Sequence, residues 1–248
     1  MKIKKNILSL LFCAVITALI LCACTTDGSS EEQETVPTAL HHEETTAPVR
    51  RSGDCIETAR EQNFTYTDSV DNYYDVTYRI PEITLFSTDA MQINSEIAAE
   101  FEPIFTEAEN CMRDKSSLSC DSLDYEYIRR ESVLSVMITR VYYSHVIAYN
   151  VYNIDVHTER RLTNEGLVEA LGGSMESVTG KLKKALEKDY KAKFKSTENY
   201  EQNRERTLSD ENLGSASLFL DSDGRLCAVC TEYADVGAKS FDVIIIIG

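Results

Sequence analysis

The sequence predicts an α+β fold, in which a mostly antiparallel sheet has helices inserted between its strands. Three observations support this class. Alternating apolar residues mark strands in both halves of the chain, apolar residues at spacings of three and four mark helices between them, and the dipeptide Asp223-Gly224 predicts a tight turn between two strands. Strands that are close along the chain pair locally. The predicted order is β-α-β-β-α-α-β-β-β.

The first predicted strand is followed by a helix. Residues 74–80 alternate between apolar and polar side chains, and this strand ends at Pro81. Apolar side chains at helical spacing then cover residues 93–112. Because proline removes a helical hydrogen bond and clashes with the preceding turn, Pro103 predicts a kink or a break near Glu102.

A hairpin and two helices are predicted next. Alternation over 134–142 and 148–156, around a turn at Ser144-His145, predicts an antiparallel pair of strands. Thr163 and Ser174 predict two helix N-termini, because their side chains cap free backbone N–H groups. The second helix carries the only basic patch of the chain, which we interpret as a solvated face, with recognition of an acidic polymer as the alternative. Its lysines are Lys181, Lys183, Lys184, Lys188, Lys191, Lys193 and Lys195.

The chain closes with three predicted strands. They cover residues 216–221, 226–233 and 240–247, after a polar connection over 194–212. Residues 244–247 are apolar on both faces, which predicts that the last strand lies inside the sheet. One domain, or two joined halves divided near residue 122, would fit the length.

The N-terminal segment has the layout of a secretory signal. Three lysines lie within the first five residues, an apolar run covers 7–22, and the small residue Ala23 precedes Cys24. This pattern is typical of a bacterial lipoprotein, so residues 1–23 are the predicted signal peptide and Cys24 is the predicted lipidation site. An uncleaved membrane anchor is the alternative, since about 17–25 apolar residues span a bilayer. Both interpretations place the rest of the chain on the extracytoplasmic face of the cell membrane.

Residues 24–63 are predicted to be a disordered tether, and residues 64–248 to be the folded domain. The tether is rich in Thr, Ser and Glu and lacks large apolar residues, so it cannot offset its ordering entropy by burial. His41-His42-Glu43-Glu44 has metal-ligating side chains. We interpret this run as solvated tether, since no second cluster supplies further ligands. Neither a metal nor another cofactor is predicted.

The composition limits the partners. The chain has 41 acidic and 25 basic side chains, a formal net charge of −16. Nucleic acid is not an expected partner, because binding its phosphates needs a surplus of Lys and Arg. Anionic lipid also repels the chain, so the membrane is expected to hold it through the lipid anchor alone. An acidic surface favours basic partners.

Five cysteines follow the lipidation site: Cys55, Cys111, Cys120, Cys227 and Cys230. Disulfides form outside the cytoplasm, and an odd number leaves at least one thiol over. Cys111 and Cys120 flank a polar loop and are the predicted pair, with Cys55 as the odd thiol. Cys227 and Cys230 have the spacing of a redox motif, but a strand places them on opposite faces, whereas working dithiols open a helix. A thiol shuttle is therefore the weakest hypothesis.

No catalytic constellation is evident. His145 and His157 have no activated serine or cysteine beside them. Aromatic side chains gather on the predicted hairpin, where they either pack as ordinary strand residues or form a recognition surface for sugars or proteins. We take them as the candidate ligand-binding residues: Tyr142, Tyr143, Tyr149 and Tyr152.

Several short elements resemble those of the extracytoplasmic domain of RsiV-type anti-sigma factors, which also precedes the catalytic domain of some peptidoglycan deacetylases. The elements are Tyr78-Arg79-Ile80-Pro81, Gln92-Ile93-Asn94, Tyr149-Asn150-Val151-Tyr152-Asn153-Ile154-Asp155, Leu162-Thr163, Asp223-Gly224, Tyr233-Ala234 and Gly237. The resemblance covers about residues 70–247. It implies a binding domain that faces the cell wall, since the anti-sigma relatives sense lysozyme.

The sequence departs from that family in ways that bear on function. The hairpin turn lacks the family's glycines, only six residues precede the apolar run, and no deacetylase domain follows. The expected function is therefore that of a membrane-tethered binding lipoprotein, whose ligand is a wall glycan or a basic protein such as lysozyme. The alternative is an envelope hydrolase acting on wall polymer, which would need two carboxylates across a cleft.

Overall fold

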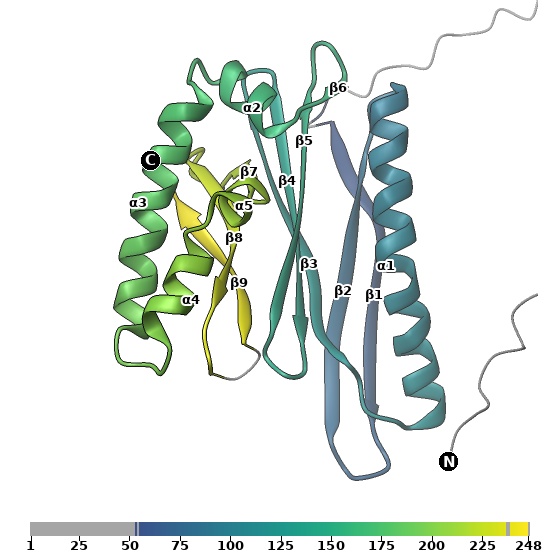
Figure 1. Cartoon of the computed structure of the whole chain (residues 1–248). Coiled ribbons are helices and arrows are strands. Elements are labelled where there is room, and N and C mark those ends of the chain that lie inside the picture. Colours follow the sequence, from purple (N-terminus) through teal and green to yellow (C-terminus); the bar gives the residue numbers. More distant parts are fainter. Residues whose placement is uncertain (1–52, 54, 237–238, 248) are drawn as a thin grey trace, which may run out of the picture. The chain divides into compact units, whose positions relative to one another are not determined.

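The predicted α+β class is confirmed. A computed structural model of the chain describes residues 53, 55–236 and 239–247, and these form two β-sheets with helices packed on them (Figure 1). They belong to one compact unit, Val49–Gly248. The predicted signal peptide, Cys24, the histidine pair and most of the predicted tether lie outside the described residues. No helix among the described residues is long and apolar enough to cross a bilayer.

The larger sheet has the strand order β1-β2-β3-β4-β5-β6, and the smaller has the order β7-β8-β9. The strands are β1 (Ile56–Thr67), β2 (Tyr73–Ile83), β3 (Cys120–Arg130), β4 (Val133–Tyr142), β5 (Ile147–Asp155), β6 (Arg160–Arg161), β7 (Ser217–Leu220), β8 (Leu226–Tyr233) and β9 (Ser240–Ile246). The helices are α1 (Thr88–Asp114), α2 (Asn164–Ala170), α3 (Met175–Phe194), α4 (Tyr200–Thr207) and α5 (Asp210–Gly214). Among the strands of the described residues, only β2 and β3 pair in parallel.

The elements stack in layers (Figure 1). Helix α1 packs on one face of the six-stranded sheet and closes the first hydrophobic core. The three-stranded sheet lies against the other face, where Phe219 and Val229 meet Met137 and Val151. Helices α2 and α3 cover the far side of the three-stranded sheet and form a further core with it.

Helix α1 is continuous. Ser87 caps its N-terminus, since its Oγ accepts a hydrogen bond from the Ala90 N–H at 3.1 Å. The predicted break near Glu102 is wrong, because the helix runs through Pro103 to Asp114. Proline in a helix interior costs about 3 kcal/mol, and the buried stripe that packs against the sheet offsets this cost. The stripe consists of Ala90, Ile93, Ile97, Phe101, Ile104, Phe105, Ala108 and Cys111.

The folded domain begins earlier than predicted. Strand β1 starts at Ile56, so the tether expected over 24–63 ends before this residue. β1 forms an antiparallel hairpin with β2, and only Phe64 and Tyr66 of β1 are buried. Asp68 closes the turn, because its carboxylate accepts hydrogen bonds from the Val70 and Asn72 N–H groups, both at 2.9 Å.

The predicted hairpin around residues 144–145 is confirmed as β4 and β5. In its turn, His145 has a positive φ of 62°, and the Tyr142 N–H donates to the Val146 carbonyl at 2.9 Å. Strand β3, which the sequence did not predict, pairs with β4 along its whole length. The helix caps predicted at Thr163 and Ser174 are also confirmed. The connection predicted over 194–212 contains α4 and most of α5.

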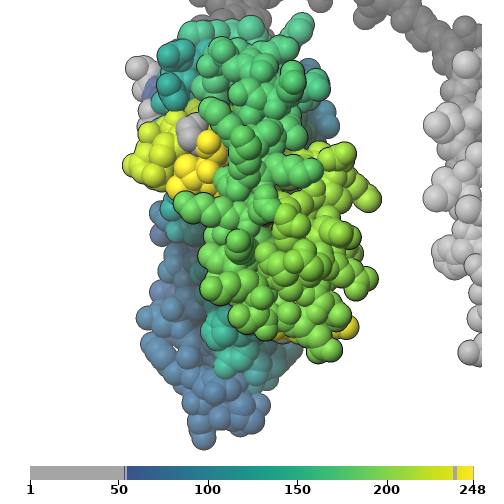
Figure 2. Space-filling view, turned by 60° about the vertical axis from the view of Figure 1, so that its left-hand side comes forward, coloured from purple at the N-terminus to yellow at the C-terminus, as the bar shows by residue number. Residues whose placement is uncertain are grey.

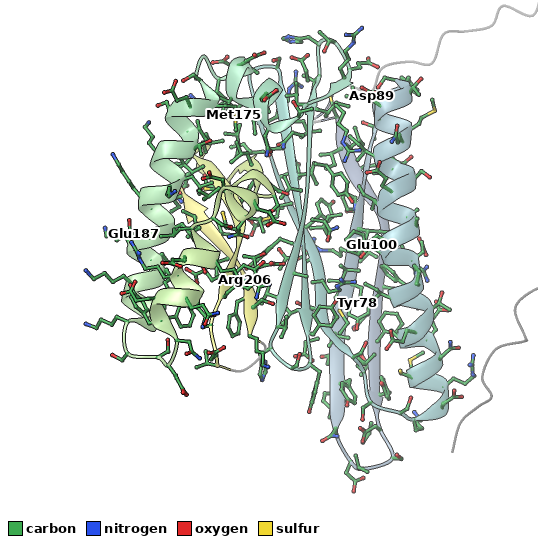
Figure 3. The ribbon with its side chains drawn as sticks, in the orientation of Figure 1. Tyr78, Asp89, Glu100, Met175, Glu187 and Arg206 are labelled. Carbon is green, nitrogen blue, oxygen red and sulfur yellow. The ribbon has the colours of Figure 1, made fainter. Side chains whose placement is uncertain are left out.

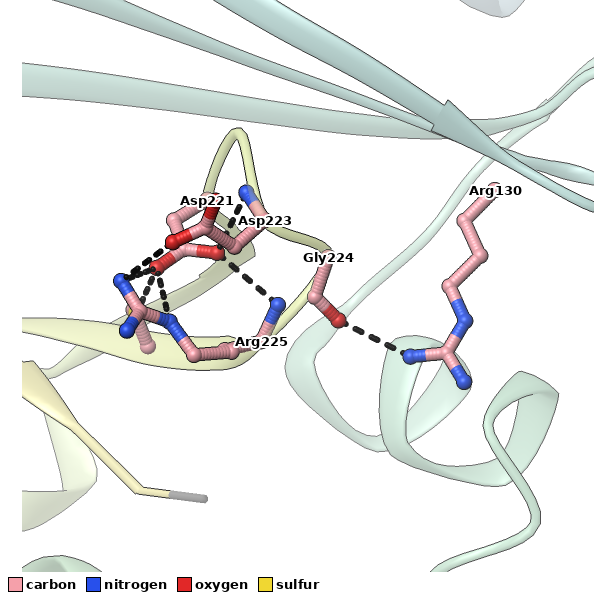
Figure 4. A network of polar contacts seen from close by, with 6 residues as sticks. Arg130, Asp221, Asp223, Gly224 and Arg225 are labelled. Carbon is pink, nitrogen blue, oxygen red and sulfur yellow. Dashed lines mark hydrogen bonds and ion pairs between the residues drawn. The ribbon is translucent and has the colours of Figure 1, made fainter.

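The turn predicted at Asp223-Gly224 joins β7 to β8 (Figure 4). Gly224 has a φ of +74°, which favours glycine. Asp221 holds the turn, because its carboxylate accepts from the Asp223 N–H at 3.1 Å and from Arg225 Nε at 2.8 Å. Arg130, at the end of β3, donates to the Gly224 carbonyl at 2.9 Å and ties this turn to the larger sheet.

Strand β9 is an edge strand, so the interior position predicted for it is wrong. Ile245 and Ile247 face the core with α3, whereas Ile244 and Ile246 remain 37% and 49% exposed. The strand thus has one face in the core and one face exposed to solvent, although residues 244–247 are all isoleucine. A run of isoleucines therefore does not require that both faces of the strand are buried.

Two buried polar side chains connect the sheets. Ser135 in β4 donates to Asn153 Oδ1 at 2.6 Å, and Asn153 Nδ2 donates to the Leu218 carbonyl of β7 at 2.8 Å. The Leu220 N–H in turn donates to Ser135 Oγ at 2.9 Å. Ser135 and Asn153 are 1% and 6% exposed, so these hydrogen bonds fix the register of one sheet on the other away from water.

Candidate functional site

The four tyrosines predicted as a recognition surface do not share one. Tyr152 is 6% exposed in the core beneath α1, and Tyr142 lies on the same face of the sheet by alternation. Tyr149 lies on the opposite face and packs against the three-stranded sheet. Tyr143 is in the turn and is 55% exposed. Strand alternation places these tyrosines on different faces of the sheet. Their presence on the hairpin is therefore better explained by strand packing than by a shared recognition surface.

The cysteines are all free thiols in the described residues. The predicted bridge between Cys111 and Cys120 is not formed. The two thiols point to different carbonyls, since Cys111 Sγ donates to Ser117 O at 3.4 Å and Cys120 Sγ to Ser122 O at 3.3 Å. Burial is the largest cause that raises the pKa of the Cys120 thiol.

The Cys227 and Cys230 thiols lie on opposite faces of β8, as the strand context predicts. Cys227 packs between the two sheets, and Cys230 faces α3. Burial, with nearby carboxylates, raises the pKa of each thiol to about 12. The reactive thiolate is therefore scarce at neutral pH, which argues against the thiol shuttle.

Negative charge is concentrated in the larger sheet and its helix. Residues 55–161 carry 19 acidic and nine basic side chains, whereas residues 162–247 carry 15 and 11. Figure 3 shows Asp89 and Glu100 along α1, with Glu187 and Arg206 on the helices at the opposite side of the stack. The part of the structure built on α1 is therefore the one that attracts a basic partner most strongly.

Several acids of α1 bind arginines of the sheet. Arg60 in β1 bonds to Glu102 and reaches Glu109 at 2.8 Å. Arg161 contacts Glu96 at 2.8 Å and lowers its pKa. These pairs hold α1 on the sheet, although exposed ion pairs contribute only about 0–1 kcal/mol each.

A shallow depression lies along α1 near its C-terminal end, and we take it as the candidate functional site. Its edge includes two exposed acids, Glu107 and Asp114. Glu107 accepts a hydrogen bond from Ser119 Oγ at 2.6 Å, and Asp114 pairs with its neighbour Arg113 at 3.3 Å. The lining is Ala98, Ala99, Glu102, Pro103, Thr106, Glu107, Asn110, Cys111, Asp114 and Ser116. Small molecules usually bind in enclosed pockets, so this open, acidic and partly apolar surface is better suited to contact a side chain of a protein partner.

A buried carboxylate, not predicted from the sequence, lies between α3 and β8. Glu232 is 0% exposed, and its Oε2 accepts a hydrogen bond from Lys193 Nζ at 3.0 Å. Lys193 also contacts Asp189 Oδ2 at 2.5 Å, and Glu232 Oε1 has no partner among the described atoms. Burial, opposed by Lys193, raises the pKa of Glu232 to about 7. The sequence could have indicated this burial, because alternation along β8 places Glu232 on the same strand face as the apolar residues Ala228 and Cys230.

Glu232 has a raised pKa but no access to solvent, so it is not a candidate acid catalyst. Among residues 53, 55–236 and 239–247, no group of three or more His, Cys, Asp or Glu side chains is arranged to hold a metal ion.

The architecture is that of an α+β domain with two stacked sheets and an acidic outer helix. No family model and no curated protein matches the chain. Among solved structures, it is similar to a member of the DUF3298 family from Bacteroides fragilis, with 14% identity over 77% of this chain and 88% of that one, and a TM-score of 0.36. Similarity at this level does not establish a family.

Proposed function

We propose that this chain is an extracytoplasmic binding lipoprotein, held to the membrane by lipid on Cys24, whose domain binds a basic protein of the lysozyme type. The observation that carries the proposal is the acid surplus of residues 55–161. The open depression on α1 supports a protein partner, because it has no enclosed space for a small ligand. A wall glycan has less support, since the hairpin tyrosines do not form an exposed stacking surface.

Charge also supports the membrane part of the proposal. A strongly acidic domain is repelled by anionic lipid, so a covalent lipid is the means that would keep it at the membrane. Two acyl chains give stable attachment, whereas one gives only marginal binding.

Cys24→Ser is expected to abolish incorporation of labelled fatty acid and to release the chain from the membrane fraction. The measurement is radiolabelled palmitate on the immunoprecipitated chain. Cys22→Ser is the matched control, because it removes a nearby thiol of the same segment and should keep the label. Label that persists in Cys24→Ser, or a wild-type chain found in the cytosol, would refute the lipoprotein part.

Lysozyme is expected to bind the purified chain, with an affinity that falls steeply as salt rises. The double variant Glu107→Gln/Asp114→Asn should weaken binding roughly tenfold through loss of steering charge. The measurement is biolayer interferometry at low and physiological salt. Glu169→Gln/Glu211→Gln is the control, because it removes two exposed acids from α2 and α5. Equal losses in both variants, or binding to purified peptidoglycan and not to lysozyme, would contradict the protein partner.

A further inference from the structure

The exposed face of α3 and its C-cap carry a row of five lysines, which we call the lysine stripe: Lys181, Lys184, Lys188, Lys191 and, at the C-cap, Lys195. Their spacing alternates between three and four residues. At 3.6 residues per turn, this places them within an arc of about 80° and over a length of about 21 Å. All five are exposed. The opposite side of the helix is its core face, with Val178, Leu182, Leu186 and Tyr190 buried.

The helix is prominent on the surface. Figure 2 shows α3 as a continuous green ridge on the face that comes forward in that view. Figure 3 shows nitrogen-tipped side chains projecting outward from the same helix. A partner can therefore reach the row along its length.

Among the described residues the lysine stripe has no ion-pair partner, although Lys191 lies close enough to Glu187 to help lower the pKa of that carboxyl, after Arg204 as the main cause. None of its members forms an ion pair there, although the whole chain has 41 acidic side chains. The acids of α3 that lie nearest are already used, since Glu187 binds Arg204 and Asp189 binds Lys193. Lys183, outside the stripe, has Asp210 at 3.8 Å.

Helix stability does not account for the stripe. Like charges three or four residues apart destabilise a helix by about 0.2–0.5 kcal/mol per pair. The helix dipole favours cations only near the C-terminus, where Lys191 lies in the last turn and Lys195 is the C-cap. Lys181 and Lys184 lie well before that turn. A row of repelling charges in an acidic chain is therefore better explained by an external anion.

We propose that the lysine stripe binds a linear, flexible polymer of phosphodiesters. Its ammonium groups form a line of point charges, and Lys is suited to phosphate in this way. A flexible chain can lie along one helix and avoid the acidic surfaces elsewhere. A rigid nucleic-acid duplex or a flat bilayer would bring further negative charge against those surfaces. No large apolar side chain of α3 is exposed to insert into lipid. This surface is independent of the lysozyme site proposed on α1.

The test uses the full-length chain in neutral detergent and a fluorescent poly(glycerol phosphate) oligomer, with binding measured by anisotropy across a salt series. Each neutralised phosphate contributes about −0.7 to the slope of log K against log salt for a flexible strand. Five contacts give an expected slope of about −3.5, and the triple variant Lys184→Gln/Lys188→Gln/Lys191→Gln about −1.4. The triple variant should also bind more than tenfold more weakly at low salt.

A charge-matched control separates the lysine stripe from net charge. Arg113→Gln/Arg160→Gln/Lys239→Gln removes three cations outside α3 and is expected to keep the wild-type slope. The proposal is overturned if the oligomer does not bind at low salt, or if both triple variants lose affinity equally. It is also overturned if duplex DNA binds as well as the oligomer, or if the chain binds phosphatidylglycerol vesicles and not the oligomer.

Discussion

Lys193→Met is expected to lower the free energy of unfolding at pH 8 by about 1.4 kcal/mol more than at pH 5. Lys193 is the counter-ion of Glu232, and its side chain keeps 42% of its exposure while Glu232 has none. Without the ammonium group, the Glu232 carboxyl takes up a proton at pH 8. That pH is one unit above its wild-type pKa of about 7, and one unit corresponds to about 1.4 kcal/mol.

The pH dependence follows from the pKa of Glu232. Burial raises this pKa from 4.5 to about 7, so the folded state holds a proton that the unfolded state releases. The stabilising contribution is complete below pH 4.5 and is lost as pH rises towards 7. In Lys193→Met the carboxylate becomes harder to ionise, and the loss at high pH grows. At pH 5 the carboxyl is neutral, which removes most of the penalty.

Urea unfolding followed by circular dichroism between pH 5 and pH 8 measures this effect. Asp189, Asp235 and Asp242 also lie close enough to the cluster to contribute charge, so the comparison is made between variants and not from one curve. Glu232→Gln/Lys193→Met is the control, since it removes the buried charge together with its partner and should recover most of the stability. A loss of equal size at pH 5 and pH 8 would refute the assignment.

Asn153→Leu is expected to cost about 3 kcal/mol at any pH between 5 and 8. The substitution leaves the Leu218 carbonyl and the Ser135 hydroxyl without the partner they have in the structure. Each buried polar group left unsatisfied costs about 1–3 kcal/mol. The new side chain is apolar, but it cannot replace the link between the two sheets.

Asn63→Leu is the matched control for this experiment. Asn63 lies on the exposed side of β1, and its hydrogen bond to Asp75 is long, at 3.4 Å. Its replacement should change stability by less than about 0.5 kcal/mol, as is usual for surface positions. The measurement is the midpoint of urea unfolding of each variant, compared with that of the wild type. If Asn153→Leu unfolded at the same midpoint as Asn63→Leu, the inter-sheet hydrogen bonds would not hold the sheets together.

The strands that the sequence predicted are those with a marked apolar pattern, whether one face is buried, as in β2, or both, as in β4 and β8. The places of β2, β4, β5, β7 and β8 in the chain are confirmed. β1 was taken as tether because it is an edge strand with few buried side chains. β3 was missed because it is rich in charged residues and only Cys120 and Leu123 of it are buried. The strand conformation of β1 and β3 is therefore determined by pairing with neighbouring strands more than by their own composition.

The candidate site was harder to predict than the fold. Sequence alone cannot show which face of β4 and β5 the second sheet covers, so the tyrosines looked like one cluster. It also cannot show that arginines from three different strands bind the acids of α1. The lysines of α3 were visible, but that the lysine stripe forms no ion pair with the described acids became clear only when Arg204 was placed beside Glu187.

The parallel junction between β2 and β3 has a consequence for how the molecule forms. The hairpin β1-β2 and the meander β3-β4-β5 each pair residues that are near in sequence, whereas Tyr78 bonds to the Cys120 carbonyl from 42 positions away. Closing that interval costs loop entropy before any contact repays it. We therefore expect the larger sheet to form from two locally folded parts, β1-β2 and β3-β4-β5, which pair through β2 and β3 while α1 packs over their junction.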